Sequence, residues 1–341
     1  MSVDTACGDA QKARDDAARF QEAYGKIKAE VSRMMVGQDE VIDGVLTALL
    51  AGGHVLLEGV PGLGKTMLVR SLGEAMDVNF SRIQFTPDLM PADIQGTTVL
   101  METEGGGHEL KFQEGPLIAN IVLADEINRA TPKTQSALLE AMQEKQLTVG
   151  RRVIKMDEPY CVMATQNPVE QEGTYPLPEA QLDRFLFKLI VGYPSEQDYH
   201  DIIDRTTGDQ GVDISPVSNA EEINDLRSIV RAVPVPNKAK SYAIRLVIAT
   251  QPDGDYAPEK VREFVSLGSS PRGVQGLMLA AKVKALLGGR FAVSVDDVKA
   301  VALPVLRHRI ALNFHAQSEG VDSDAVIAEI LDSVRAPDDI E

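Results

Sequence analysis

The sequence predicts an α/β fold in which a parallel sheet is sandwiched between helices, carries inserted hairpins and is followed by an all-α domain. Short apolar runs alternate with helix-length amphipathic segments between residues 41 and 191, which is typical of a parallel sheet covered on both faces. Pairs of strand-like segments around glycines interrupt this alternation twice. After a polar stretch at 206–220, only helical periods of hydrophobicity remain.

The elements of the first domain follow from these periods. Residues 1–30 indicate a frayed tail that leads into a helix. Apolar runs predict buried parallel strands at 55–57, 78–85, 121–124, 160–164 and 185–191. Amphipathic spacing predicts helices at 41–50, 67–76 and 134–143.

Two hairpins are expected within this domain. The first joins strands at 97–101 and 109–113 through Gly105, Gly106 and Gly107, which favour a mobile tip. The second joins strands at 146–149 and 153–156 through Gly150 and Arg151.

The expected divisions of the chain are an N-terminal tail or helix (1–30), an αβα core (31–205), a linker (206–220) and a helical domain (221–341). In the last of these, helical periods predict helices at 221–232, 239–250, 273–287, 296–310 and 323–334.

Composition excludes several classes of protein. The 341 residues include 34 basic and 51 acidic side chains, a net charge of −17, which disfavours a dedicated nucleic-acid binder. Cys7 and Cys161 are far apart and lack metal-ligand spacing, which excludes a disulfide scaffold and a cysteine zinc site and fits a reducing cytosol. Cys161 lies in an apolar run, where a buried structural thiol is expected. The sequence shows neither a membrane span nor the apolar core of a secretory signal, so we expect a cytoplasmic protein.

Residues 59–66 match the phosphate-binding pattern G-x-x-x-x-G-K-[ST], with an apolar strand before it and a helix after it. Its glycines let successive backbone N–H groups converge on phosphate oxygens, and the helix start adds its positive dipole end. Lys65 supplies a charge to the β- and γ-phosphates, and Thr66 a hydroxyl ligand for Mg²⁺. The residues expected to bind nucleotide here are Gly59, Val60, Pro61, Gly62, Leu63, Gly64, Lys65, Thr66 and Met67.

Two carboxylates, Asp125 and Glu126, end the apolar run at 121–124. Acids at the end of a buried strand are costly unless a cation or water uses them, and this edge of a parallel sheet is where ligands bind. We expect Asp125 to hold Mg²⁺ through water and Glu126 to polarise the attacking water; an acidic helix cap is the alternative. Asn167 follows the next strand, where it could orient the water or bind the γ-phosphate.

Two arginines are further candidates. Ser270 and Pro271 open a helix, and we expect Arg272 in its first turn to reach back to phosphate; a solvent-exposed arginine is the alternative. Arg184 lies at the junction into the last core strand beside Asp183, so spacing alone favours a local ion pair.

Together these motifs resemble the MoxR family of AAA+ ATPases over residues 30–335. The stretches that carry the resemblance are VGQ (36–38), GVPGLGKT (59–66), LADEINRA (123–130), ATQNP (164–168), QEGTYPLPEAQLDRF (171–185) and SSPRG (269–273). The resemblance implies an AAA+ core and a helical lid, with ATP at their junction and at a subunit interface. It also implies a homo-oligomeric ring, expected to be a hexamer, with both hairpins directed toward its pore.

The resemblance also implies roles for single residues. Val36, Gly37 and Gln38 match the segment that lines the adenine pocket. Asn167 matches sensor 1 and Arg272 matches sensor 2.

Arg184 resembles the arginine finger, which would act on the neighbouring subunit's ATP. Its competitors for that role are Arg129, Arg151 and Arg152.

By resemblance, the chain is an ATP- and Mg²⁺-dependent enzyme that remodels or activates a protein client, often with a partner that carries a von Willebrand factor A domain, in metal-cofactor insertion or complex maturation. One alternative is the ATPase subunit of a metal chelatase. A nucleic-acid motor is disfavoured by the charge of −17 and by an aromatic content of 5%. A non-hydrolysing nucleotide switch is disfavoured by the presence of Lys65, Asp125, Glu126 and Asn167.

Overall fold

A five-stranded sheet in the order β2-β5-β8-β1-β9 forms the centre of the molecule, and its neighbouring strands are all parallel. The computed structural model describes residues 3–60, 62–102, 108–150, 152–168, 173–207 and 213–337. The strands of this sheet are β1 (Val55–Glu58), β2 (Phe80–Gln84), β5 (Ile121–Asp125), β8 (Cys161–Gln166) and β9 (Phe187–Ile190). Each lies on one of the predicted apolar runs, so the predicted parallel sheet is confirmed.

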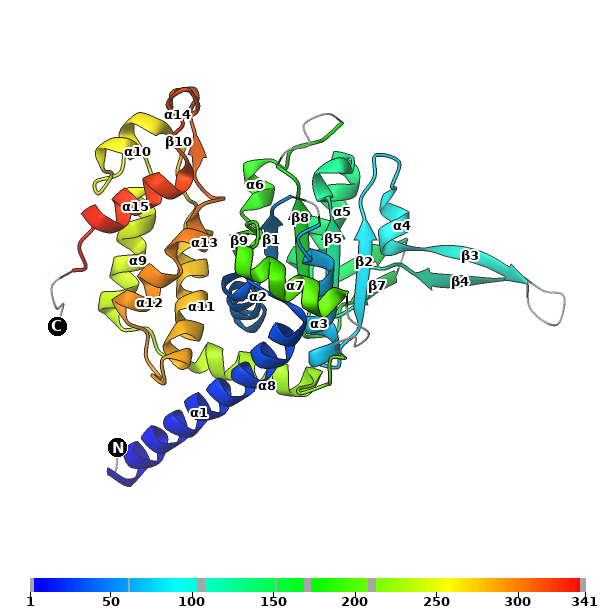
Figure 1. Cartoon of the computed structure of the whole chain (residues 1–341), viewed down its shortest axis with the longest axis horizontal. Helices are drawn as coiled ribbons and strands as arrows, with labels where there is room; N and C mark the ends of the chain where they lie inside the picture. Colours follow the sequence, from blue (N-terminus) through cyan, green and yellow to red (C-terminus); the bar gives the residue numbers. More distant parts are fainter. Residues whose placement is uncertain are drawn as a thin grey trace.

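Helices cover both faces of the sheet (Figure 1). Those before residue 207 are α1 (Val3–Met34), α2 (Asp39–Ala51), α3 (Lys65–Ala75), α4 (Pro91–Gln95), the 3₁₀ turn η1 (Ile127–Arg129), α5 (Pro132–Glu144), α6 (Glu179–Leu182) and α7 (Glu196–Thr206). Val55 and Leu123 are buried with α2 and α3, whereas their neighbours Leu56 and Val122 are buried with α5. Because alternate side chains enter opposite cores, these strands are apolar along their whole length.

The helix expected within residues 1–30 is present, but in the described part of this segment no tail precedes it. A continuous helix, α1, begins at Val3. Phe20, Ile27 and Val31 are fully buried at helical spacing, and α1 packs against α2, α3 and the lid helix α11 (Pro271–Leu287). These apolar residues are widely spaced along the sequence, so the helical pattern is weak there. Their burial against the other helices stabilises α1 through tertiary packing.

Both predicted hairpins are confirmed. β3 (Gly96–Glu102) pairs with β4 (His108–Glu114), and this ribbon projects from the body of the molecule (Figure 1). β6 (Gln146–Val149) pairs with β7 (Arg152–Lys155). The glycines at 105–107, where a mobile tip is expected, lie outside the described residues, as does Arg151.

The C-terminal region is mainly helical. Its helices are α8 (Ala220–Ala232), α9 (Asn237–Ala249), α10 (Glu259–Phe264), α11, α12 (Val295–Ala300), α13 (Ala302–Leu306), α14 (Phe314–Glu319) and α15 (Ser323–Ser333). Two expectations need correction. The region is not purely α, because β10 (Val265–Leu267) pairs with β11 (Ala311–Leu312). The single helix expected at 296–310 is broken at Val301, since Pro304 has no N–H to continue the ladder back to Ala300.

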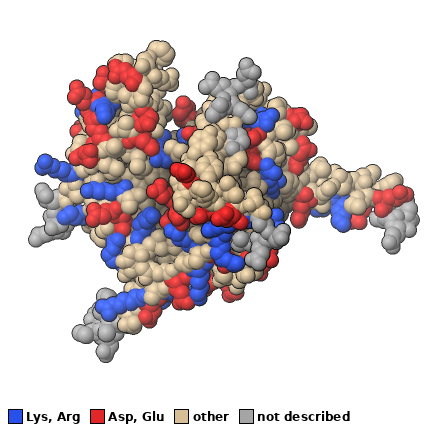
Figure 2. Space-filling view, in the orientation of Figure 1, with Lys and Arg blue, Asp and Glu red and all other residues tan. Residues whose placement is uncertain are grey.

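Acidic and basic side chains are intermixed over the face seen in Figure 2. Among the described residues, no helix is long and apolar enough to cross a membrane.

Candidate functional site

The phosphate loop joins β1 to α3. Gly62 and Gly64 have φ of 87° and 77°, in the left-handed region that glycine adopts without strain. A Cβ on Gly59 would lie 2.6 Å from the carbonyl oxygen of Val191, so this close approach also requires glycine. Lys65 is 9% exposed, and its Nζ donates to the carbonyl oxygen of Gly59 at 2.5 Å. Pro61 lies outside the described residues.

Lys65 is a partly desolvated cation with three acids near it. Burial lowers the pKa of its ammonium group, and the charges of Asp125, Glu126 and Glu58 oppose that shift. An ammonium group that is partly removed from water at a phosphate loop is stabilised by binding a phosphate. The phosphate replaces the interactions with water that burial removed.

Asp125 lies at the carboxyl end of β5 and is held by two donors. The Thr165 hydroxyl donates to Asp125 Oδ1 at 2.6 Å, and Arg82 Nη2 lies 2.7 Å from Oδ2. The same Thr165 oxygen accepts a hydrogen bond from the backbone N–H of Glu126 at 2.8 Å. One hydroxyl from β8 therefore fixes both acids relative to each other.

Glu126 has φ of 58°, a left-handed conformation that is uncommon outside glycine and that often marks functional turns. This conformation turns its side chain into the cleft. Its Oε2 accepts from Gln84 Nε2 and from Arg129 Nη1, both at 2.8 Å. The carboxylate predicted to polarise water is therefore restrained by its own chain.

These groups line one cleft of about 520 Å³. It brings together eight predicted residues: Gly62, Gly64, Lys65, Thr66, Met67, Asp125, Glu126 and Asn167. It also contains Arg70, Arg82, Gln84 and Thr165, to which the sequence analysis gave no role. A signal was present for Gln84 and Thr165, because the ends of parallel strands share one edge of the sheet. Thr165 also lies in the stretch ATQNP (164–168).

A second pocket of about 490 Å³ meets this cleft at Gly62, Gly64 and Met67. Val36 and Gln38 line it, as the resemblance implies. Its other walls include Met34, Met35, Tyr193, Tyr199 and Ile202, which sequence reasoning did not identify. Apolar and aromatic walls next to a phosphate loop suit a flat, largely apolar base.

Gly37 shapes this pocket without lining it. Its φ is 68°, and a Cβ there would lie 2.4 Å from the carboxylate of Asp198. The adjacent Gln38 donates through Nε2 to the carbonyl oxygen of Gly192 at 3.2 Å. The segment is thus fixed against the loop that precedes α7.

Arg272 does not line the phosphate cleft of its own chain in this structure. Its Nη1 lies 3.6 Å from Asp183 Oδ2, and it lines a third pocket of about 220 Å³ together with Arg184. That pocket lies beside His54 and Leu186, which precede β1 and β9, whereas the phosphate loop follows β1. The part of the lid that carries Arg272 therefore lies at the amino edge of the sheet, which is the side where its parallel strands begin. None of the described residues beyond 213 lines the cleft or the base pocket at the carboxyl edge, where the strands end.

Arg184 is half-buried at this amino edge. Its Nη1 donates to the carbonyl oxygen of Leu139 in α5 at 2.8 Å, rather than pairing with Asp183 as spacing alone favoured. Among its competitors, Arg129 pairs with Glu126 of its own chain, and Arg152 lies on the exposed hairpin strand β7.

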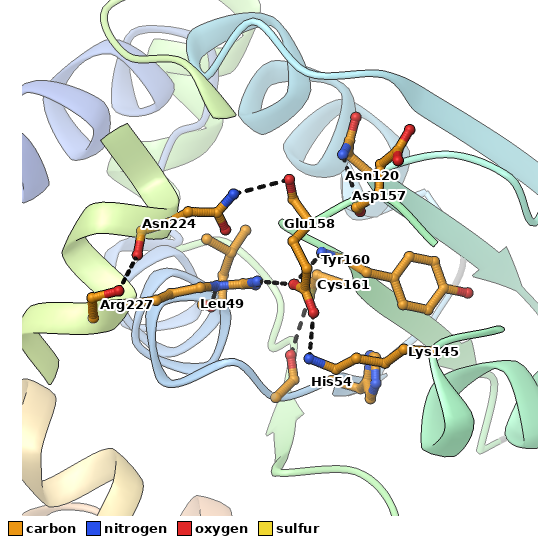
Figure 3. Close-up of polar contacts among 12 residues, drawn as sticks. Leu49, His54, Asn120, Lys145, Asp157, Glu158, Tyr160, Cys161, Asn224 and Arg227 are labelled. Carbon is orange, nitrogen blue, oxygen red and sulfur yellow. Dashed lines mark hydrogen bonds and ion pairs between the residues drawn. The ribbon is translucent and has the colours of Figure 1, made fainter. Parts of the chain in front are cut away.

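A polar cluster supports the amino edge (Figure 3). Glu158 accepts from Lys145 Nζ at 2.5 Å and from Arg227 Nη1 at 2.6 Å, which joins the end of α5 and the segment between β7 and β8 to α8. Nearby, His54 is buried and donates to the carbonyl oxygen of Met142, and burial lowers its pKa to about 4.

Cys161 is buried at the start of β8. Burial raises the pKa of its thiol to about 12, and Sγ donates to the carbonyl oxygen of Gly53 at 3.3 Å. A thiol in this state is unreactive at neutral pH, so the predicted structural role is supported.

Among the described residues, no group of three or more His, Cys, Asp or Glu side chains could hold a metal ion. The cleft does contain the hydroxyl of Thr66 and the carboxylate of Asp125. This donor set fits Mg²⁺, which binds through one or two protein oxygens together with waters and substrate phosphates.

Comparison with known proteins agrees with this geometry. Residues 54–187 match the model of the ATPase family associated with various cellular activities (AAA), and 259–330 match an AAA lid domain. The chain is 45% identical to YeaC of Bacillus subtilis, a protein of uncharacterised function, over 92% of this chain and 94% of that one. It is 44% identical to the chaperone MoxR1 of Mycobacterium tuberculosis, over 90% and 81% respectively. A crystal structure of a protein from Cytophaga hutchinsonii superposes with a TM-score of 0.89 at 38% identity, over 97% of this chain and 99% of the other.

Proposed function

Because the chain belongs to the MoxR family of AAA+ ATPases, we propose that it hydrolyses ATP within a homo-oligomeric ring and uses the energy to remodel or activate a protein client. The observation that carries this proposal is the single cleft that contains Lys65, Thr66, Asp125, Glu126 and Asn167 beside an apolar base pocket. Binding would place the base against Val36 and the triphosphate along the loop at 59–66.

In this proposal, the residues of the cleft have different roles in hydrolysis. Lys65 and the loop amides bind the β- and γ-phosphates. Thr66 and Asp125 would hold Mg²⁺, which when bound neutralises charge on the phosphate oxygens. Glu126 takes a proton from the attacking water as it approaches the γ-phosphorus, and Asn167 orients that water.

Glu126 is restrained in the single chain. Gln84 and Arg129 both donate to its Oε2, which lowers the capacity of the carboxylate to accept a proton from water. We expect nucleotide and subunit assembly to exchange these donors for the water, which would keep hydrolysis slow in the isolated chain.

Arg184 and Arg272 are assigned to the neighbouring subunit's ATP. They share a pocket at the amino edge of the sheet, whereas the cleft lies at the carboxyl edge. A ring that sets one subunit's amino edge against the next subunit's cleft would place both cations at the γ-phosphate. An arginine supplied in this way accelerates phosphoryl transfer by roughly 10³–10⁵.

The same proposal includes four divisions of the chain: a tail or helix at 1–30, a core at 31–205, a linker at 206–220 and a lid at 221–341. It also includes a hexameric ring and a client partner with a von Willebrand factor A domain. The ATPase subunit of a metal chelatase is the second candidate, because the first hairpin, β3–β4, resembles an insertion that magnesium chelatase shares. The charge of −17 and the intermixed surface charges of Figure 2 disfavour a nucleic-acid motor.

Two variants test the proposal. Lys65→Ala should lose ATP binding and hydrolysis, because the phosphates lose their buried cation; hydrolysis at the parent rate would contradict the proposal. Glu126→Gln should bind ATP without splitting it, so affinity capture in ATP should retain the client and identify it. Capture of a chelatase subunit by this variant would favour the second candidate.

A further inference from the structure

Arg309, in the lid, is hydrogen-bonded to the segment 183–186, which contains Arg184. Its side chain is only 3% exposed, and burial lowers its pKa to about 10, so it stays charged at neutral pH. Arg309 Nε donates to Asp183 Oδ1 at 2.9 Å, Nη2 to the carbonyl oxygen of Phe185 at 2.6 Å, and Nη1 to that of Leu186 at 3.2 Å. Nη2 also lies 3.3 Å from the carbonyl oxygen of Asp183, and Nη1 donates to that of Val305.

Asp183 also contacts a second part of the lid, the start of α11. The Ser270 hydroxyl, at the start of α11, donates to Asp183 Oδ2 at 2.8 Å. Arg272 lies two residues further along and approaches the same oxygen at 3.6 Å. One carboxylate therefore links Arg309, the helix start that carries Arg272, and the segment 183–186.

The neighbouring lid residue His308 strengthens the same attachment. Its Nε2 donates to the carbonyl oxygen of Phe185 at 3.0 Å. Burial and the charge of Arg309 hold the pKa of His308 well below its usual range, so the ring is neutral. On its other side, the segment contacts α5 through Arg184 and Leu139, and the backbone N–H of Leu186 donates to the carbonyl oxygen of His54 at 2.8 Å.

Arg309 is suited to this role by its shape. Its planar fork donates in several fixed directions at once, which a lysine ammonium on a flexible stem cannot reproduce. A buried cation that satisfies a carboxylate and several carbonyl oxygens is costly to remove and defines one arrangement of the groups around it.

We propose that Arg309 is a positioning residue for hydrolysis on the neighbouring subunit: through Asp183 it sets the placement of Arg184 and Arg272 together and makes that placement depend on the lid. This inference rests on the proposed function, because it needs both arginines to act across an interface. The inference adds a residue that does not contact nucleotide. It also explains how a movement of the lid would change the placement of Arg184 and Arg272 at the subunit interface.

The test is Arg309→Lys, which keeps the charge and loses the fork. Misplacing a catalytic group by about 1 Å costs on the order of 10²-fold, so the rate at saturating ATP should fall by about 10²-fold. Affinity for a fluorescent ATP analogue should stay within about twofold of the parent value, since the chain's own cleft is intact. Arg307→Lys is the matched control, because Arg307 is a mostly buried lid arginine that pairs with Asp324 and reaches the core only at the carbonyl oxygen of Lys188, at 3.4 Å, so it should keep the parent rate.

A mixing experiment separates positioning from general damage. Excess Lys65→Ala subunits have an intact amino edge and an inactive cleft, so they should restore hydrolysis at the clefts of Arg309→Lys by at least about tenfold. A structural defect in the Arg309→Lys subunit would not be repaired by its neighbour. A loss that persists in the mixture, or a rate equal to that of Arg307→Lys, would overturn the proposal.

The remaining outcomes are also decisive. Hydrolysis at the parent rate by Arg184→Ala would overturn both this inference and the proposed interface, whereas its loss together with an unimpaired Arg309→Lys would overturn only the inference. If Arg309→Lys does not fold, Ser270→Ala takes its place, because it removes one donor to Asp183 and leaves Arg309 buried. Its rate should fall by about 3- to 10-fold and recover on mixing; an unchanged rate would overturn the proposal.

Discussion

The candidate catalytic groups at the two edges of the central sheet are held differently. At the carboxyl edge, each acid is held by two donors of the same chain: Asp125 by Thr165 and Arg82, and Glu126 by Gln84 and Arg129. At the amino edge, Arg272 lies 3.6 Å from Asp183, its ion-pair partner among the described residues, and its side chain is 45% exposed.

On the proposed function, one chain carries two halves of different sites. The carboxyl edge would bind phosphates and activate water, although Arg82 and Arg129 there pair with its own acids. Arg184 and Arg272 at the amino edge would meet the γ-phosphate of another copy. Hydrolysis would then depend on assembly, which suits an enzyme that converts nucleotide state into movement between subunits.

The largest effect that would sharpen this comparison is expected from Arg184→Ala. We expect turnover to fall by about 10³-fold or more, because the transition state loses a cation that water cannot replace. Nucleotide affinity should be retained, since Arg184 does not line its own chain's cleft. Steady-state phosphate release and equilibrium nucleotide binding measure the two quantities; loss of both together would place Arg184 in its own site and break the comparison.

Arg272→Ala should behave in the same manner with a smaller loss of turnover, about 10²-fold, because its exposed side chain is less ordered in the single chain. The same two assays check it. A large loss of nucleotide affinity would restore the expectation that Arg272 binds the phosphate of its own chain.

Gln84→Ala tests the restraint at the carboxyl edge. Removing one of the two donors to Glu126 should raise basal hydrolysis by about 3- to 10-fold, because the carboxylate becomes freer to accept from water. Arg70→Ala is a suitable control, since Arg70 lines the same cleft but pairs with Glu74 on its own helix. A fall in rate for Gln84→Ala would show that Gln84 assists the reaction rather than restrains it.

The smallest effect concerns the stability of the amino edge. Burial lowers the pKa of His54 from 6.5 to about 4, so the folded chain keeps it neutral while the unfolded chain protonates it below about pH 6.5. The free energy of unfolding is therefore highest above pH 6.5 and falls as the pH decreases toward 4. His54 should contribute a loss of about 1 kcal/mol between pH 7.5 and pH 5.5.

Urea unfolding at the two pH values measures this term. His54→Gln should show a smaller loss over the same interval than the parent chain, even if it is less stable at both pH values. An equal loss in the two proteins would exclude His54 as the source.

The sequence predicted the carboxyl edge well because its chemistry lies in short local patterns. The loop at 59–66 and the acids after β5 each follow a strand, so their convergence needed only the rule that parallel strands end at one edge. Gln84 obeys the same rule but lies in no motif, and Thr165 lies in ATQNP (164–168), where only Asn167 was given a role. The corrections to α1 and α12–α13 arise where tertiary packing or one proline overrides a periodic pattern.

The amino edge could not be predicted in the same way. The placement of Arg272 depends on where the lid docks, and that docking rests on contacts between residues far apart in sequence, such as Arg309 with Phe185 and Ser270 with Asp183. A helix start with an arginine in its first turn looks the same whether it faces its own phosphate or a neighbour's.

The most direct test of the two-edge account is to mix Lys65→Ala with Arg184→Ala. Each variant alone should be inactive, the first for lack of phosphate binding and the second for lack of a cation at its neighbour's phosphate. The account predicts that the mixture recovers hydrolysis at least about tenfold above either variant, because an intact cleft then meets an intact arginine edge. A mixture in which both variants are confirmed to share rings but which remains as inactive as its components would contradict the account.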